Sequence, residues 1–401
     1  MEFASFLSSL LVIYIAARLC GELAARAGQS PVLGELLAGV LVGSSGFGWV
    51  EQTDVLKLLS EIGVLLLLFE VGLESDLASF LKVGASAALV AIIGIVTPFV
   101  LGYGLAILLH RSQLQALFIG ATLTATSVAI TARVLRDMGH LKSTAGYVIL
   151  GAAVLDDILG LVILAGLVGV AESGTVSWGT IGWPAAMSVA LLSGALFVGV
   201  RLSSILTGIL HAMKTRGSLV IAATSFALAF AYLASRLSVA PLVGAFAAGL
   251  ILARTEHHAH IREQIKPVVD VFSPIFFVMV GVTVQVATLS PLDPQSRSTL
   301  LLAGGLTLAA IIGKLLSGFG VLGEQVNRWA VGMGMVPRGE VGLIFASIGL
   351  SSHILGEGDY AALLMMVTVT TLLAPLLLTF VLGRTEEVNE AGRMHRTGDD
   401  R

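Results

Sequence analysis

The sequence predicts an all-α polytopic membrane protein of thirteen transmembrane helices, built as two inverted six-helix repeats joined by a linker helix. The first observation behind this prediction is composition: 56% of the 401 residues are hydrophobic and 12% are charged, about half the roughly 25% of a soluble domain. The second is a series of apolar segments of about 20 residues, the length that crosses the hydrocarbon as a helix. The third is the distribution of Lys and Arg between the connections.

Thirteen apolar segments follow one another with short connections. They are residues 3–25, 31–49, 55–74, 83–109, 113–135, 143–171, 183–206, 217–235, 238–254, 267–289, 299–323, 327–351 and 359–383. A polar tail, 384–401, follows them. None of the connections is long enough for a soluble domain, and the short alternating strands of a transmembrane barrel are not seen. The single cysteine, Cys20, excludes an intrachain disulfide and a cysteine metal cluster.

The basic residues predict which side of the membrane each connection faces. Of the 23 Lys and Arg residues, four fall on one side and two fall inside segments, while all the others fall in the odd-numbered connections and the tail. The four are Lys57, Arg111, Arg236 and Arg297, and the two are Lys314 and Arg338. Since cytoplasmic connections carry the excess of positive charge, the N-terminus is expected outside and the C-terminus in the cytoplasm.

Thirteen segments divide naturally into six, a linker and six. The two sets of six are then related by an offset of seven segments, and an odd offset inverts the second set relative to the first. Inverted repeats are the common construction of secondary transporters, with the transport site near the middle of the membrane between the repeats. A channel or a receptor has less reason to show this arrangement.

Three charged residues lie where a membrane span should be apolar. They are Asp156, Asp157 and Lys314, all far from the expected ends of their segments. A charge at the bilayer centre costs about 2.5–3.5 kcal/mol on insertion scales, so it persists where it faces a cavity or a partner. A structural ion pair or a helix cap is the plain alternative for the aspartates, and a lysine that snorkels to the interface is the alternative for Lys314.

The two aspartates are expected to do different work. Neighbouring residues of a helix point about 100° apart, so Asp156 and Asp157 cannot both face one point. One carboxylate can pair with Lys314 while the other faces a water-filled cavity. Breaking such a pair frees a carboxylate and favours loss of the lysine's proton, which couples proton release to cation capture.

Two segments supply oxygen ligands and backbone breaks. The segment 113–135 is crowded with hydroxyls, and the segment 327–351 is rich in glycine around a proline. The residues concerned are Thr122, Thr124, Thr126, Ser127 and Thr131 in the first, and Gly332, Gly334, Pro337, Gly339 and Gly342 in the second. Both are the fifth members of their repeats, and matched interrupted helices indicate a transport site. Beside Pro337, Arg338 and Glu340 are expected to pair with each other or to brace the broken helix.

Glycine also predicts packing outside these segments. Gly39 and Gly43 form a G-x-x-x-G pattern in the second segment, a spacing that brings helices close together in a membrane. We expect it to serve helix packing within the chain.

These motifs resemble a known family. They are GATLTATSVAITARVLRDMG (120–139), ILGAAVLDDILGLVIL (149–164), IIGKLLSGF (311–319) and MVPRGEVGLI (335–344), with PVLGELLAGVLVG (31–43) and LLLFEVGLE (66–74) before them. In order and spacing they resemble the bacterial monovalent cation:proton antiporters of the second cation:proton antiporter family, within the sodium/proton exchanger superfamily. The resemblance runs from about residue 5 to 383 and is closest to the electrogenic two-aspartate sodium/proton antiporters.

The resemblance implies roles for individual residues. Asp157 would be the main carboxylate that binds the monovalent cation and the proton, while Asp156 would pair with Lys314 and release it during the cycle. Thr126 and Ser127 would lie at the break of the first discontinuous helix, close to the ion. Pro337, Arg338 and Glu340 would belong to the second.

The resemblance also implies a domain organisation within the membrane unit, 1–383. A core domain, residues 83–171 and 299–383, would move against a dimerisation domain, residues 3–74 and 217–289. The segment 183–206 would link the two, and 384–401 would be a cytoplasmic tail. A homodimer in the cell (inner) membrane is therefore expected.

The leading functional hypothesis is exchange of sodium (or lithium) for protons by alternating access, electrogenic, with no cofactor, no nucleic acid and no enzymatic reaction. Potassium/proton antiport is the alternative. A cation channel and a sodium-coupled symporter are further alternatives from other classes, and the symporter would need a larger polar cavity than these apolar segments suggest. A receptor without transport would leave the charges in the middle of the membrane unexplained.

Overall fold

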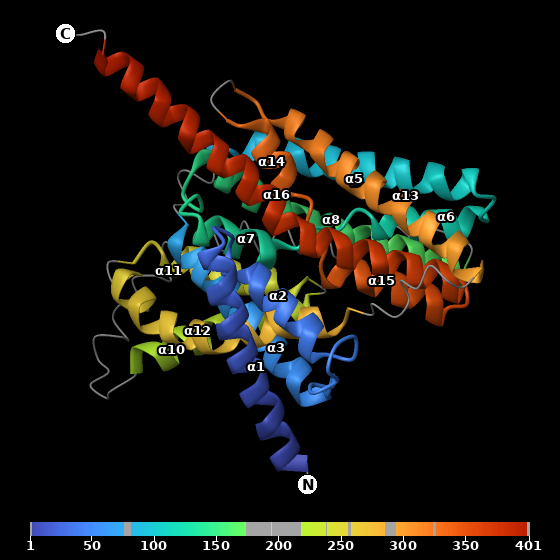
Figure 1. Ribbon diagram of the computed structural model, residues 1–401, viewed down its shortest axis with the longest axis horizontal. Helices are drawn as coiled ribbons and strands as arrows, with labels where there is room; N and C mark the ends of the chain where they lie inside the picture. The colour runs from blue at the N-terminus through green and yellow to red at the C-terminus, as the bar shows by residue number, and fades with distance from the viewer. Residues whose placement is uncertain are drawn as a thin grey trace.

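The structure is a computed structural model that describes residues 2–75, 82–173, 194, 218–237, 239–255, 258–284, 294–323 and 326–398. Within these residues every regular element is a helix (Figure 1). In chain order the elements are α1 (Glu2–Arg26), α2 (Pro31–Val42), α3 (Asp54–Glu74), α5 (Gly84–Leu108), α6 (Gln113–Thr122), α7 (Val128–Asp137), α8 (Thr144–Ser173), α10 (Ser218–Arg236), α11 (Pro241–Leu252), α12 (His258–Val282), α13 (Pro294–Ser317), η2 (Gly318–Gly320), α14 (Arg328–Gly334), α15 (Glu340–Ser351) and α16 (Glu357–Gly398).

The prediction of an all-α membrane protein is confirmed. Among the described residues, seven helices are long and apolar enough to cross a membrane, and α2, α11 and α15 are shorter apolar helices. Large apolar side chains cover the outside of the molecule; Leu301, for example, is 78% exposed, as a lipid-facing surface requires. The predicted linker helix, 183–206, lies outside the described residues except for position 194.

The helices form two groups that stand side by side (Figure 1). In the first group, α3 packs against α11 and α12, α2 packs against α1 and α12, and α10 packs against α11. In the second group, α5 packs against α6, α8 and α13, and α13 packs against α16. The groups contact each other where α7 and α16 meet α2, and where α7 meets α3. Each group combines helices from both halves of the chain.

Glycines set the close packing of the first group, and they occur in a repeated pattern. The pattern is Pro31, Gly34, Gly39 in α2 and Pro241, Gly244, Gly249 in α11. A side-chain carbon at Gly39 would lie 2.0 Å from the Val278 carbonyl oxygen of α12, and one at Gly249 would lie 2.2 Å from the Phe69 carbonyl oxygen of α3. Since the two contacts are equivalent in the two repeats, α2 and α11 are related elements, as the predicted repeat requires.

Both predicted interruptions are present. The first separates α6 from α7, and the second separates α14 from α15. At the first, the Thr124 hydroxyl donates to the Ala121 carbonyl at 2.7 Å, a local bond of the kind that competes with the helix ladder. At the second, Pro337 has no N–H to continue the helix and disfavours helical geometry at the residue before it. The sequence reasons for the breaks are therefore visible in the backbone.

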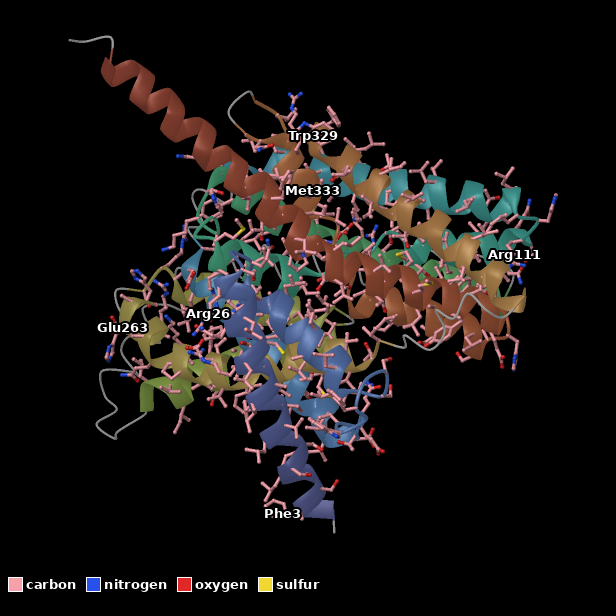
Figure 2. The ribbon with its side chains drawn as sticks, in the orientation of Figure 1. Phe3, Arg26, Arg111, Glu263, Trp329 and Met333 are labelled. Carbon is pink, nitrogen blue, oxygen red and sulfur yellow. The ribbon has the colours of Figure 1, made fainter. Side chains whose placement is uncertain are left out.

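The two ends of the molecule carry different connections. Figure 2 shows Glu263 at the far left of the molecule, Arg26 nearer its middle and Arg111 at the far right.

Candidate ion-binding site

The two interrupted helices cross at their breaks. The Ser127 N–H, at the start of α7, donates to the Pro337 carbonyl oxygen at 2.8 Å. The Thr131 hydroxyl of α7 donates to the Gly334 carbonyl oxygen at 2.7 Å, where α14 ends. These bonds tie the two breaks together, so four half-helix ends meet at one place inside the second group.

The crossing concentrates partial charges. The ends of α6 and α14 present carbonyl groups with partial negative charge, and the starts of α7 and α15 present N–H groups with partial positive charge. In lipid each of these backbone groups needs a partner within the protein. A buried crossing of this kind can therefore accept both a cation and an anionic side chain.

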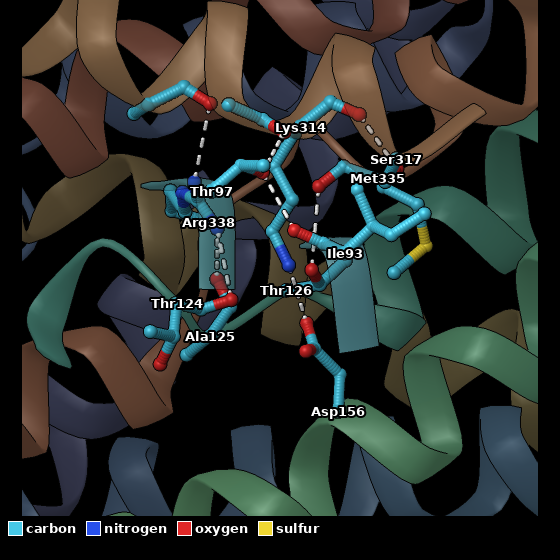
Figure 3. Close-up of polar contacts among 12 residues, drawn as sticks. Ile93, Thr97, Thr124, Ala125, Thr126, Asp156, Lys314, Ser317, Met335 and Arg338 are labelled. Carbon is cyan, nitrogen blue, oxygen red and sulfur yellow. Dashed lines mark hydrogen bonds and ion pairs between the residues drawn. The ribbon is translucent and has the colours of Figure 1, made fainter. Parts of the chain in front are cut away.

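Arg338 is the fixed cation of the crossing. It is fully buried, and its Nη1 donates to the carbonyl oxygens of Ala125 at 2.6 Å and Thr124 at 3.2 Å. Its Nη2 donates to the Ala310 carbonyl oxygen at 3.3 Å. The guanidinium thus satisfies carbonyls in the break between α6 and α7 (Figure 3), a geometry that braces the break. Glu340 begins α15, and its side chain lies outside what the structure describes.

Lys314 and Asp156 form an ion pair. Lys314 Nζ lies 2.7 Å from Asp156 Oδ2, and neither side chain is exposed. The close-up shows the lysine reaching from α13 toward the carboxylate on α8 (Figure 3). The Thr126 hydroxyl lies beside this pair, near the Asp156 carboxylate and 3.3 Å from the Met335 carbonyl oxygen. The structure therefore brings together three of the residues that the sequence singled out.

Asp157 follows Asp156 in α8 and is 5% exposed. Because successive helix residues point about 100° apart, Asp157 does not share the direction in which Asp156 meets Lys314. Near the crossing, Ser127 Oγ is buried and has no hydrogen-bond partner among the described residues. Hydroxyl, carbonyl and carboxylate oxygens are the ligands that hard cations prefer, so this part of the second group has the donor set that a small cation needs.

The position of Lys314 within its helix differs from the prediction. It lies in the last turn of α13, which ends at Ser317 and continues into η2, whereas the sequence places it in the middle of a longer span. It is nevertheless fully buried, so the alternative of a snorkelling lysine is wrong. The helix ends early because Gly318 and Gly320, poor helix formers, follow Ser317.

The neighbours of Lys314 on α5 were not found from the sequence. The Thr97 hydroxyl lies 2.6 Å from the Gly313 carbonyl oxygen, and Gly313 packs directly on Pro98. The signal in the sequence is a proline inside an apolar span. Such a proline reads first as a kink, because nothing in one sequence shows which helix faces it.

A second cluster of charges joins the two helix groups through α7. Arg136 Nη1 lies 2.6 Å from Glu70 Oε2 on α3, and Arg136 Nε lies 3.8 Å from Glu74 Oε2. Arg262 on α12 also pairs with Glu74, at 2.8 Å. These acids are almost fully buried, whereas the Arg262 side chain is 43% exposed, so solvent reaches the cluster from the arginine side.

The same end of α7 makes two further polar contacts. Arg133 Nη1 donates to Ser273 Oγ on α12 at 3.0 Å, and Ser30 Oγ, before α2, donates to Asp137 Oδ2 at 2.8 Å. The count of basic residues places Arg133 and Arg136 in a connection, but the structure places them inside α7. The reason is the helix break, which restarts the helix at Val128 and carries it beyond the predicted end of the span.

A comparison with protein families finds one matching model. Its description is "Sodium/hydrogen exchanger, transmembrane", and it covers residues 9–384.

Several characterised proteins are similar along nearly their whole length. The high-affinity Na(+)/H(+) antiporter NhaS3 of Synechocystis sp. is 40% identical, over 93% of this chain and 88% of that protein. The Na(+)/H(+)-K(+) antiporter GerN of Bacillus cereus is 33% identical, over 98% of this chain and 100% of that protein. The Na(+)/H(+) antiporter of Enterococcus hirae is 31% identical, over 94% and 97%.

A solved structure has the same fold. The sodium proton antiporter MjNhaP1 of Methanocaldococcus jannaschii, determined at pH 8, aligns with a TM-score of 0.68 at 18% sequence identity. The alignment covers 96% of this chain and 98% of that one. At this identity the likeness concerns the arrangement of helices.

Proposed function

This chain belongs to the sodium/hydrogen exchanger family, and from that membership we propose that it exchanges sodium (or lithium) for protons across the membrane by alternating access. The observation that carries the proposal is the fully buried Lys314–Asp156 pair, set beside Asp157 and the crossing of two broken helices. The relatives described as Na(+)/H(+) antiporters support sodium as the cation.

The site residues have separate roles in this proposal. Asp157 binds either the cation or a proton, so occupancy by one excludes the other and couples the two fluxes. Asp156 holds Lys314 while no cation is bound and releases it when the cation arrives. Thr126 and Ser127 add oxygen ligands at the first break. Since Lys314 also loses its proton after Asp156 releases it, more than one proton moves per sodium ion and transport is electrogenic.

Arg338 and Pro337 support the second break. Arg338 keeps its positive charge throughout the cycle and holds the break after α6 in place. Its charge balances one of the two carboxylates when Lys314 is displaced. Glu340 belongs to the same support by its position at the start of α15.

Potassium is the second candidate cation, because the relative GerN is described as a Na(+)/H(+)-K(+) antiporter. A dye that reports internal pH in proteoliposomes separates the two candidates. Sodium, lithium and potassium chloride are offered in turn to vesicles with a preset proton gradient. We expect sodium and lithium to drive saturable proton movement at millimolar or lower concentrations. If only potassium drives saturable proton movement, potassium and not sodium is the exchanged cation.

The two helix groups are the two moving parts in this proposal. The second group, within 83–171 and 299–383, is the core domain that carries the ion, and the first, within 3–74 and 217–289, is the dimerisation domain of a homodimer. The segment 183–206 links them. The N-terminus lies outside and the tail lies in the cytoplasm of a cell (inner) membrane, so the cluster on α7 lies on the cytoplasmic side.

Neutralising Glu70 tests whether the two helix groups move relative to each other. Alternating access requires the groups to shift, and the Arg136–Glu70 pair joins them. We expect Glu70→Gln to favour the state that is open to the cytoplasm, because one of the contacts that closes that side is weakened. The apparent sodium affinity should rise about threefold to tenfold from the cytoplasmic side and fall from the other side, because a shift between two states acts oppositely on the two.

A matched control is Asp359→Asn. Asp359 is also a buried acid and pairs with Arg111 at 2.8 Å, but both residues lie in the second group. Its neutralisation should leave the ratio of the two affinities unchanged. If Glu70→Gln also leaves that ratio unchanged, the pair does not join moving parts and the division is wrong.

A further inference from the structure

We propose that the backbone carbonyl of Gly94 on α5 is a second hydrogen-bond acceptor for the Lys314 side chain. The lysine would bind it after Asp156 releases the lysine. This inference rests on the proposed function, because it concerns where the lysine goes when a cation reaches the site. It assigns a positioning role to Gly94 and Pro98, two residues of α5 for which the ion-exchange proposal has no other use.

The first step concerns an unpaired acceptor. In an α-helix the carbonyl of each residue accepts from the N–H four residues later. Four residues after Gly94 stands Pro98, which has no N–H. Both residues are buried, and a buried carbonyl without its helical donor favours any other donor within reach. The sequence thus leaves one acceptor open on the face of α5 that packs against α13.

The second step concerns distance. A side-chain carbon at Gly94 would lie 3.4 Å from Lys314 Nζ and 3.2 Å from Ser317 Cβ. The ammonium group therefore lies against the backbone of Gly94 even while it pairs with Asp156. A side chain at this position would narrow the space beside the ammonium group. An ammonium has three donors, and one of them is used by Asp156 Oδ2.

The third step concerns the frame that holds the two groups together. The Thr97 hydroxyl lies 2.6 Å from the Gly313 carbonyl oxygen. A side-chain carbon at Gly313 would lie 2.7 Å from Pro98 N and Cα, so α5 and α13 are in direct contact at this step. The lysine can then swing between carboxylate and carbonyl by side-chain rotation alone.

The consequence is a lower cost of ion capture. A buried lysine that loses its carboxylate partner would otherwise have unpaired donors, and leaving a buried charged group unpaired is expensive. A carbonyl at the second position accepts a hydrogen bond from either the ammonium or the neutral amine. Sodium binding at the aspartates is therefore favoured by a partner that the sodium never touches.

The test is Pro98→Ala, assayed by the sodium-dependent rise in thermal midpoint of the purified, full-length protein. Alanine restores an N–H that donates to the Gly94 carbonyl. It also keeps the N, Cα and Cβ atoms that Gly313 contacts. We expect the sodium concentration needed for half of the rise to increase about tenfold. The midpoint without sodium at acidic pH, where Lys314 stays on Asp156, should not fall.

Pro274→Ala is the matched control, since Pro274 is also inside a helix but belongs to α12 of the first group. It restores a helical N–H away from the ion and should leave the sodium dependence as in the wild type. A Pro98→Ala protein with wild-type sodium dependence overturns the inference. So does one whose midpoint falls equally with and without sodium, because that result indicates a structural role alone.

If Pro98→Ala does not yield folded protein, Gly94→Ala decides, because its methyl group fills the space beside Lys314 Nζ. The same increase in the required sodium concentration is expected, and an unchanged requirement overturns the inference. A wild-type protein that shows no response to sodium would contradict the proposed function itself and this inference with it. If instead the wild type responds to sodium and the variant responds equally, this inference is wrong while the proposed function stands.

Discussion

Asp157→Asn is expected to abolish sodium-dependent proton flux while the protein stays folded. Asparagine has the same shape but cannot ionise, so it can neither carry a proton in exchange nor neutralise a bound cation. Asp157 is 5% exposed, and a neutral side chain there also removes the cost of a buried charge. We therefore expect flux in proteoliposomes to fall at least about a hundredfold, since a bound cation loses its main carboxylate ligand.

The result needs a control for folding. Asp359→Asn removes another buried carboxylate of the second group, one that pairs with Arg111 away from the crossing, and it should retain exchange. Gel filtration and the thermal midpoint show whether Asp157→Asn is folded. Sodium-driven proton flux in a folded Asp157→Asn protein would mean that another group binds the cation, and the assignment of Asp157 would be wrong.

Lys314→Met should give the largest loss of stability. The lysine and Asp156 are 2.7 Å apart with no solvent exposure, and removing one partner of a buried pair costs about 3–5 kcal/mol because the other charge is left without compensation. The thermal midpoint of the purified protein at neutral pH should fall clearly. Exchange, where it survives, should carry less charge per cycle, because one of the groups that loses a proton is gone.

The double variant Asp156→Asn/Lys314→Met separates pairing from packing. With both members of the pair neutral, neither leaves the other's charge uncompensated, so most of the lost stability should return. If the losses of the two single variants simply add in the double variant, the two residues do not stabilise each other. The Lys314–Asp156 pair would then contribute nothing to the stability of the protein.

Much of the fold could be predicted because lipid imposes strong rules on a sequence. Apolar length locates the helices, and a hydroxyl-rich or glycine-rich span breaks where its backbone can find partners within the protein. The breaks at Thr124 and Pro337 follow from local chemistry, so they were predictable. The pairing of Lys314 with one of the two aspartates was predictable because three buried charges in lipid have few ways to be satisfied.

What could not be predicted depends on which helix faces which. The sequence does not show that Pro98 lies against Gly313, or that Arg136 reaches Glu70 across two helix groups. Nor does it show that Arg338 binds the carbonyls in the break after α6, because a neighbouring Glu340 offers a nearer partner along the chain. These contacts join residues far apart in sequence, and a single sequence contains periodicity but no record of such contacts.

The central proposal is that a cation and protons compete for the same buried carboxylates. Calorimetric titration of sodium into the purified protein, in buffers with different heats of ionisation, counts the protons released for each sodium ion bound. The proposal predicts release of more than one proton per sodium ion. The apparent sodium affinity should then fall by more than about tenfold for each unit by which the pH is lowered, over the range where the site becomes protonated. Sodium binding that releases no protons and is independent of pH would contradict it.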